Sequence, residues 1–212
     1  MTEGLQSLRA DVAYMRGLAE EGRRAPLLGG SISVAAGLIY GAASLGHYAV
    51  VTDRIGEGPT WSLLAIWLGA GAVMGLAVWL LTPATRDRPG AASAGNKAAS
   101  LAWMSIGWSI GAVFLAFFVA ASRTGEWVIM DLLLSVALAF YGAAWGVSAG
   151  MSGARWLWLV SLGSLASAVG LAFLVGRPEL YLAFAAGLLF WAVAPGLLMM
   201  RQAAEQRGEA SA

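Results

Sequence analysis

Six stretches of this chain contain no charged residue, and each is long enough to cross a lipid bilayer. They cover residues 25–52, 58–85, 98–122, 132–154, 156–176 and 180–200, and nearly every Arg, Lys, Asp and Glu lies between them. A hydrocarbon core of about 30 Å requires about 20 apolar helical residues. Because lipid offers no partners to backbone N–H and C=O groups, each crossing segment must satisfy them internally as a helix. The pattern therefore predicts an all-α integral membrane protein with six transmembrane helices.

These helices occupy most of the 212 residues and leave no room for a separate water-soluble domain. Only 12% of the residues are charged, which is well below the share of about 25% in soluble domains. We expect a cytoplasmic or interfacial amphipathic helix over 1–24, a transmembrane bundle over 25–200 and a short cytoplasmic tail over 201–212. In the bundle, three antiparallel hairpins are expected, with helices at about 26–51, 60–82, 98–121, 127–149, 155–176 and 179–200.

The distribution of the cations predicts how the chain is oriented. With six crossings, ten Lys and Arg residues fall on the side of the termini and three (Arg54, Arg123 and Arg177) on the other. Loops rich in Lys and Arg remain cytoplasmic, so both termini are expected in the cytoplasm. Twelve Arg against a single Lys, with abundant Ala and Gly, is typical of a GC-rich bacterial genome. We therefore expect a multi-pass protein of the bacterial inner membrane.

Pairs of glycines spaced four residues apart recur in the predicted helices. Small residues let helix backbones approach closely in lipid, so these glycines are expected at helix contacts within the bundle or, alternatively, in a homo-oligomer. Ser105–Phe117 and Ser161–Phe173 also agree at seven of thirteen positions, which either an internal repeat or a chance match in a small apolar alphabet explains. The glycines predicted to pack are Gly37, Gly41, Gly71, Gly75, Gly107, Gly111, Gly142 and Gly146.

The N-terminal segment has a different pattern from the six apolar stretches. Leu5, Leu8, Val12 and Met15 follow an alternating three- and four-residue spacing, and charged residues occupy the other faces. Such an amphipathic helix either lies on the lipid headgroups or offers its apolar stripe to a partner helix. We therefore consider the lipid bilayer and a cytoplasmic protein as the partners of this segment.

Two ionisable residues lie close to the outer ends of predicted helices. His47 precedes the end of the first helix, and Asp131 follows the start of the fourth. At a rise of about 1.5 Å per residue, both are within about one turn of the outer boundary. An outer-facing polar site formed by the two residues is one interpretation. The other is a structural or interfacial role for each, with Arg123 as a partner for Asp131 and the helix dipole favouring an anion there.

The sequence lacks the residues of several kinds of chemistry. With one His, the chain cannot supply the paired His ligands of a transmembrane haem, and without Cys it cannot carry out thiolate chemistry. Its single Lys, Lys97, lies at a predicted cytoplasmic boundary, which does not suit a retinal Schiff base inside a helix. Catalytic zinc needs about three protein ligands. We expect no cofactor, no metal, no catalytic residues and no nucleic-acid partner.

Three functional classes are considered, of which an enzyme is the least favoured because no catalytic set is evident. The first is a non-enzymatic membrane protein that acts as a sensor, scaffold or regulator through a cytoplasmic partner. The alternative is a small transporter or channel for a neutral or lipophilic solute, which the repeat, the Gly-rich helices and Pro195 inside the last helix would suit.

Overall fold

The computed structural model describes residues 12, 27–54, 61–86, 88 and 90–210, and this part of the chain is helical and contains no strand. Five of its helices are long and apolar enough to cross a membrane, and a sixth apolar helix, Trp156–Ala172, is shorter. The elements in chain order are α2 (Gly30–Val51), α3 (Trp61–Arg86), α4 (Ala94–Thr124), η1 (Trp127–Asp131), α5 (Leu132–Ser152), α6 (Trp156–Ala172), α7 (Glu179–Leu188), η2 (Leu189–Val193) and α8 (Ala194–Ala210).

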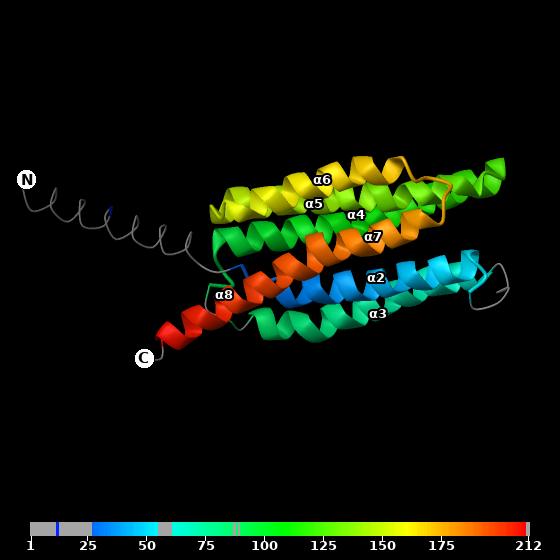
Figure 1. Ribbon diagram of the computed structural model, residues 1–212. Coiled ribbons are helices and arrows are strands. Elements are labelled where there is room, and N and C mark those ends of the chain that lie inside the picture. Colours follow the sequence, from blue (N-terminus) through cyan, green and yellow to red (C-terminus); the bar gives the residue numbers. More distant parts are fainter. Residues whose placement is uncertain (1–11, 13–26, 55–60, 87, 89, 211–212) are drawn as a thin grey trace, which may run out of the picture.

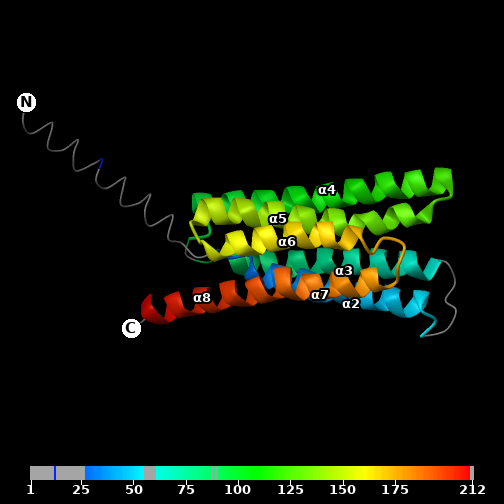
Figure 2. The ribbon, with the colours of Figure 1, turned by 45° about the horizontal axis from the view of Figure 1, so that its top comes forward.

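The helices form two layers that run roughly parallel to one another (Figures 1 and 2). One layer holds α4, α5 and α6, and the other holds α2, α3 and the broken helix α7–η2–α8. Within the layers, α5 packs mainly against α6 and α4, and α2 packs against α3 and the broken helix. The start of α2 and the end of α8 lie at the same end of the bundle, which we call the terminal end; the opposite end is the loop end.

The third predicted hairpin differs from the expectation. The pairs α2–α3 and α4–α5 pack as antiparallel neighbours, whereas α6 packs chiefly on α5, and α7 and α8 pack chiefly on α2. Close contacts at two glycines fix which helices α6 and the broken helix pack against. A Cβ added to Gly142 of α5 would lie 2.7 Å from Leu165 Cγ of α6, and a Cβ added to Gly37 of α2 would lie 2.5 Å from Val193 Cγ2 of η2. Neighbours in sequence therefore end in different layers.

The predicted packing glycines divide into two groups. Gly37, Gly142 and Gly146 lie against a neighbouring helix. At the others a Cβ would meet nothing within 4 Å: Gly41, Gly71, Gly75, Gly107 and Gly111. The glycine faces of α3 and α4 are exposed, so within the described chain they face outward and make no helix contact.

The last helix is interrupted at its middle by the π-helical turn η2, which directly precedes the buried Pro195. Proline has no N–H, so the carbonyl of Trp191 loses the donor that an α-helix would supply four residues later. Trp145 of α5 donates its indole N–H to that carbonyl at 2.8 Å. The neighbouring carbonyl of Ala192 accepts a bond of 2.9 Å from the Ser33 hydroxyl of α2. The carbonyl of Trp191 thus joins the two layers, and the carbonyl of Ala192 joins the broken helix to α2 within its own layer.

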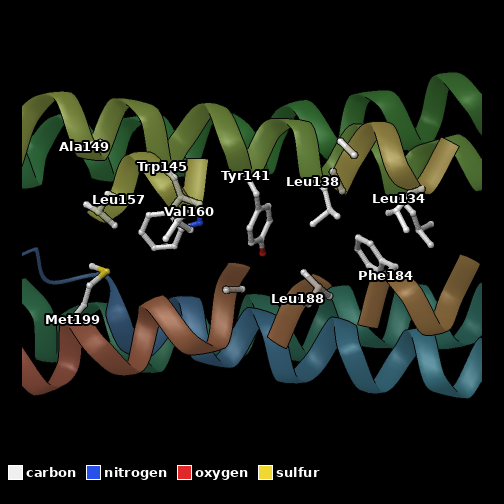
Figure 3. Close-up of a cluster of buried hydrophobic side chains, with 14 of the residues drawn as sticks. Leu134, Leu138, Tyr141, Trp145, Ala149, Leu157, Val160, Phe184, Leu188 and Met199 are labelled. Carbon is white, nitrogen blue, oxygen red and sulfur yellow. The ribbon is translucent and has the colours of Figure 1, made fainter. Parts of the chain in front are cut away.

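Large apolar side chains fill the space between the layers (Figure 3). Tyr141 and Trp145 of α5 extend toward the layer that contains Leu188 and Met199. Trp145 and Leu188 are almost completely buried. The middle and the terminal end of the bundle therefore have a continuously packed core.

Helix ends differ from the expected ones where polar sequence continues a helix. The last helix extends to Ala210 instead of ending near 200, because Ala, Gln, Glu and Arg are good helix formers and elongation needs no new nucleus. α4 begins earlier than expected, at Ala94, where the Ser93 hydroxyl caps it by accepting from the Asn96 N–H. Of the predicted helix over 1–24, Leu5, Leu8 and Met15 lie outside the described residues, and Val12 is helical and exposed.

The contact between α2 and α8 can be tested at Gly196. An added Cβ there would lie 2.7 Å from the backbone oxygen of Gly30, and a backbone atom cannot rotate away. We expect Gly196→Ala to lower the free energy of unfolding by about 1–3 kcal/mol, the usual cost of overpacking. Gly107→Ala, where the new methyl group meets nothing within 4 Å, serves as the matched control and is expected to show no loss. Titration with sodium dodecyl sulfate in mixed micelles measures both, and equal values would contradict the close contact.

Candidate functional site

A cavity of about 610 Å³ lies at the loop end of the bundle, between the two layers. Its wall is mostly aliphatic and aromatic: α3 contributes Trp61, Leu64 and Trp67, and α4 contributes Phe114 and Phe118. The cavity is lined further by His47, Val51, Leu63, Trp127, Val128, Met130, Asp131, Leu133, Leu134, Gly176, Arg177, Pro178 and Tyr181. This volume falls in the range of small-molecule sites, about 300–1,000 Å³.

The cavity exists because α3 and α4 pack away from each other. α3 packs on α2 and α4 packs on α5, so at the loop end their side chains face across an open space. Leu64 and Trp61 are exposed, and Phe114 and Phe118 are half-buried. The side of the cavity between these two helices is therefore apolar and open to the surroundings of the bundle.

His47 stands on the polar wall of the cavity and is 9% exposed. The Trp67 indole N–H donates a hydrogen bond of 2.9 Å to its Nδ1 atom. An indole N–H can only donate, so Nδ1 must be the unprotonated nitrogen of the ring. His47 is thus a neutral imidazole that carries its proton on Nε2. Its ring is stacked on that of Tyr181, with centroids 3.7 Å apart and planes 16° apart.

Asp131 lies at the junction of η1 and α5 and has two partners from the other side of the cavity. The Tyr181 hydroxyl donates to Oδ1 at 2.5 Å, and the Gly176 N–H donates to Oδ2 at 3.0 Å. Gly176 lies in the turn before α7 and has a positive φ of 79°, a backbone conformation that residues with side chains disfavour. In this conformation its N–H donates to Asp131. Asp131 thereby ties η1 to α7. Arg123, which the sequence offered as a possible partner, is not among the hydrogen-bond partners of Asp131 in the described residues.

The rim of the cavity is formed by residues that suit a membrane–water boundary. Trp61 and Trp127 are both exposed, and Arg177 is exposed beside them. Tryptophan is enriched at headgroup level. The polar wall thus lies at one edge of an otherwise apolar cavity, and a cation stands at its mouth.

The structure brings His47 and Asp131 to one cavity wall, where Tyr181 contacts both. Tyr181 and Trp67 are the residues of this wall that were not predicted from the sequence. Helix spacing could have supplied part of the signal, since Tyr181 begins α7 at the same end of the bundle as His47. The predicted packing glycines and the N-terminal stripe contribute nothing to this site.

Within the described residues, no three His, Asp or Glu side chains come together in a way that would hold a metal ion. No protein-family model, curated protein or solved structure is significantly similar to this chain. The chemistry of the cavity must therefore be argued from its own residues.

The bond from Tyr181 to Asp131 predicts a measurable contribution to stability. Tyr181→Phe keeps the ring stacked on His47 but leaves one carboxyl oxygen without its donor, and an unsatisfied buried group costs about 1–3 kcal/mol. We expect the free energy of unfolding to fall by that amount. Tyr40→Phe is the matched control, because the Tyr40 hydroxyl makes no hydrogen bond in the described part of the chain.

In the same mixed-micelle titration, Tyr181→Phe combined with Asp131→Asn should cost less than the sum of the single changes, because the two residues share one bond. Strict additivity would show that the two groups do not interact.

Proposed function

We propose that this chain is a multi-pass membrane protein that senses a lipophilic molecule through the cavity at its loop end. Membrane insertion is supported by the five long apolar helices. α6, with 17 residues, is near the lower limit of about 17 for a crossing helix. Large apolar side chains also face outward, with Trp108 78% and Phe173 80% exposed. Soluble proteins rarely expose extensive apolar surface, whereas lipid would cover it.

The charges support an orientation with both termini in the cytoplasm. Arg88, Lys97, Arg155 and Arg201 lie at the terminal end, and Arg54, Arg123 and Arg177 at the loop end. In the sequence, four further Arg precede α2 and belong to the same side as its start if the chain crosses as proposed, which gives that side the excess that cytoplasmic loops carry. On this proposal the cavity opens in the outer half of a bacterial inner membrane.

The cavity supports binding of a lipophilic ligand because its wall is apolar except at one edge, the usual arrangement of small-molecule sites. The open side between α3 and α4 would face the acyl chains, so a ligand could enter laterally from the bilayer without crossing water. The single observation that carries this proposal is the apolar cavity bounded by two helices that do not pack together.

A sensor fits better than a transporter or channel because every residue that lines the cavity lies in the loop-end half of the described bundle. Beneath it the layers are joined by Leu138, Tyr141, Trp145 and Leu188, which are buried (Figure 3). A solute would need to displace this packed core to cross. The transporter is therefore the second candidate, favoured only by the interruption of the last helix at η2.

The broken helix offers a route from the cavity to the cytoplasmic end. α7 carries Tyr181 in the cavity wall and continues through η2 into α8, which extends to Ala210 at the terminal end. π-helical turns are frequent at functional sites and can change their hydrogen bonding locally. A ligand against Tyr181 could thus shift α8, and a partner at the cytoplasmic end would detect the shift. The predicted stripe of residues 1–24 is the surface we propose for that partner.

The orientation can be tested with single cysteines, because the chain contains none. We expect Thr124→Cys at the loop end to react with a membrane-impermeant maleimide in intact cells. Ala92→Cys at the terminal end should react only after the membrane is permeabilised. Both positions are exposed, so a lack of reaction reports on the membrane. Labelling of Ala92→Cys in intact cells would reverse the proposed orientation.

Entry of a lipophilic molecule can be tested with a hydrocarbon probe that carries a photoactivatable diazirine in its chain. In vesicles, the probe should label Leu134, which is buried and lines the cavity, and should not label Leu138, which is buried one turn further along α5 outside the cavity. Leu63→Trp, which fills the cavity from α3, should reduce labelling of Leu134. Leu68→Trp on the outer face of α3 should not. Absence of label at Leu134 would contradict the proposal.

A further inference from the structure

We infer that the ligand of this cavity is an uncharged amphiphile with a planar carbonyl-bearing head, of the quinone class, and that His47 Nε2–H donates a hydrogen bond to its carbonyl oxygen. This inference rests on the proposed lipophilic site and adds the chemical identity of the ligand head. It follows from the donors and acceptors that the cavity wall leaves uncommitted.

The protonation of His47 is fixed by Trp67. Because the indole N–H donates to Nδ1, the imidazole must carry its proton on Nε2. That N–H has no hydrogen-bond partner among the described residues, although the side chain is nine-tenths buried in the cavity wall. The enclosed side-chain atoms without a partner in the described residues are Ser62 Oγ and Ser135 Oγ, and His47 Nε2 is not among them. The Nε2–H is therefore accessible, and because His47 lines the cavity the wall is complementary to a ligand that supplies an acceptor.

The polar groups next to His47 on the wall are already engaged. The Trp67 N–H is bound to His47, and the Tyr181 hydroxyl and the Gly176 N–H are bound to the two oxygens of Asp131. At this edge of the cavity His47 thus presents a directed donor, and no carboxyl oxygen is left without a hydrogen bond; the other donors of the lining, on Trp61, Trp127 and Arg177, belong to exposed side chains at the rim. A ligand head that must donate hydrogen bonds would compete with existing ones, whereas a carbonyl head would not.

The shape of the cavity favours a flat ring. The side chains of Phe114, Phe118 and Trp127 form a continuous aromatic group, with Phe118 and Trp127 in an edge-to-face contact at 5.8 Å. Aromatic side chains contact planar rings in stacked and edge-to-face geometries. A hydrocarbon tail attached to such a ring could leave through the open side between α3 and α4.

The cation at the mouth suggests a competing ligand with a different head. Arg177 is exposed and makes no ion pair within the described chain, so it could attract a carboxylate or phosphate. An anionic head held at Arg177 would not use the His47 donor, which lies at the polar wall. The two alternatives therefore depend on different side chains and can be separated.

The test uses competition against the diazirine hydrocarbon at Leu134 in vesicles containing the full chain. The competitors are decyl-benzoquinone and decylbenzene, which share ring and tail and differ in the two carbonyl groups, and decanoate as the anionic probe. We expect decyl-benzoquinone to displace the label at a concentration about tenfold below that of decylbenzene, the effect of one buried hydrogen bond.

The variants assign that difference to His47. His47→Phe keeps a ring against Tyr181 and should remove the tenfold advantage of the quinone. His47→Gln, whose amide can accept from Trp67 and donate to the ligand, should restore most of it. Ser44→Ala is the matched control: it removes a buried hydroxyl one turn away on α2, bonded to the Tyr181 carbonyl, but does not line the cavity. It should retain the advantage in full.

Equal displacement by decyl-benzoquinone and decylbenzene, unchanged in His47→Phe, would overturn this inference and leave the lipophilic site intact. Displacement by decanoate alone, lost in Arg177→Gln, would overturn it in favour of an anionic head. If the hydrocarbon does not label Leu134 in the unmodified chain, the proposed site itself fails.

Discussion

The bond from Trp145 to the Trp191 carbonyl joins the two layers at the centre of the bundle. Pro195 cannot donate to that carbonyl, and the Trp145 indole supplies a donor in its place. The Trp191 side chain completes the junction: its indole donates to Ser167, and its ring lies where Gly163 has no side chain. Asp131 adds a second polar link at the loop end through Tyr181 and Gly176, and the Leu28 N–H adds a third at the terminal end by donating to Asn96. Between these links the layers meet through apolar side chains, so the central junction sets the placement of the layers directly beneath the cavity.

The positions of the helices could be predicted from the sequence because uncharged length is the property that a bilayer selects. The pairing of the helices could not. Sequence neighbours were expected to pack as hairpins, but α6 follows the fit of Leu165 over Gly142 and α7–α8 follows the fit of Val193 over Gly37. Each of these contacts joins a small residue to a large one that is more than twenty residues away in the sequence. A four-residue glycine spacing is shared by faces that pack and faces that do not, so Gly71 and Gly107 could not be told apart from Gly37.

For the candidate site, the sequence predicted how far along its helix each residue lies. His47 and Asp131 were expected near one boundary because each lies close to the end of an uncharged stretch, and both line the same cavity. Depth does not determine the direction of a side chain around the helix axis. For that reason Arg123 was considered as the partner of Asp131, whereas Tyr181 and the Gly176 backbone take that position. The cavity itself results from the separation of α3 and α4, which no local pattern encodes.

The two ionisable groups on the polar wall, His47 and Asp131, are both held by hydrogen bonds, and the cation Arg177 is exposed at the rim. Asp131 has both oxygens engaged, and His47 is held neutral by the donor on Trp67. An ion in lipid is costly unless it is paired or reaches water, so this arrangement lets polar groups line an apolar cavity at low cost. A neutral imidazole differs from a charged one in having a single N–H, and Trp67 determines which nitrogen carries it. The indole bond that keeps the wall uncharged thus also sets the direction in which the cavity can donate.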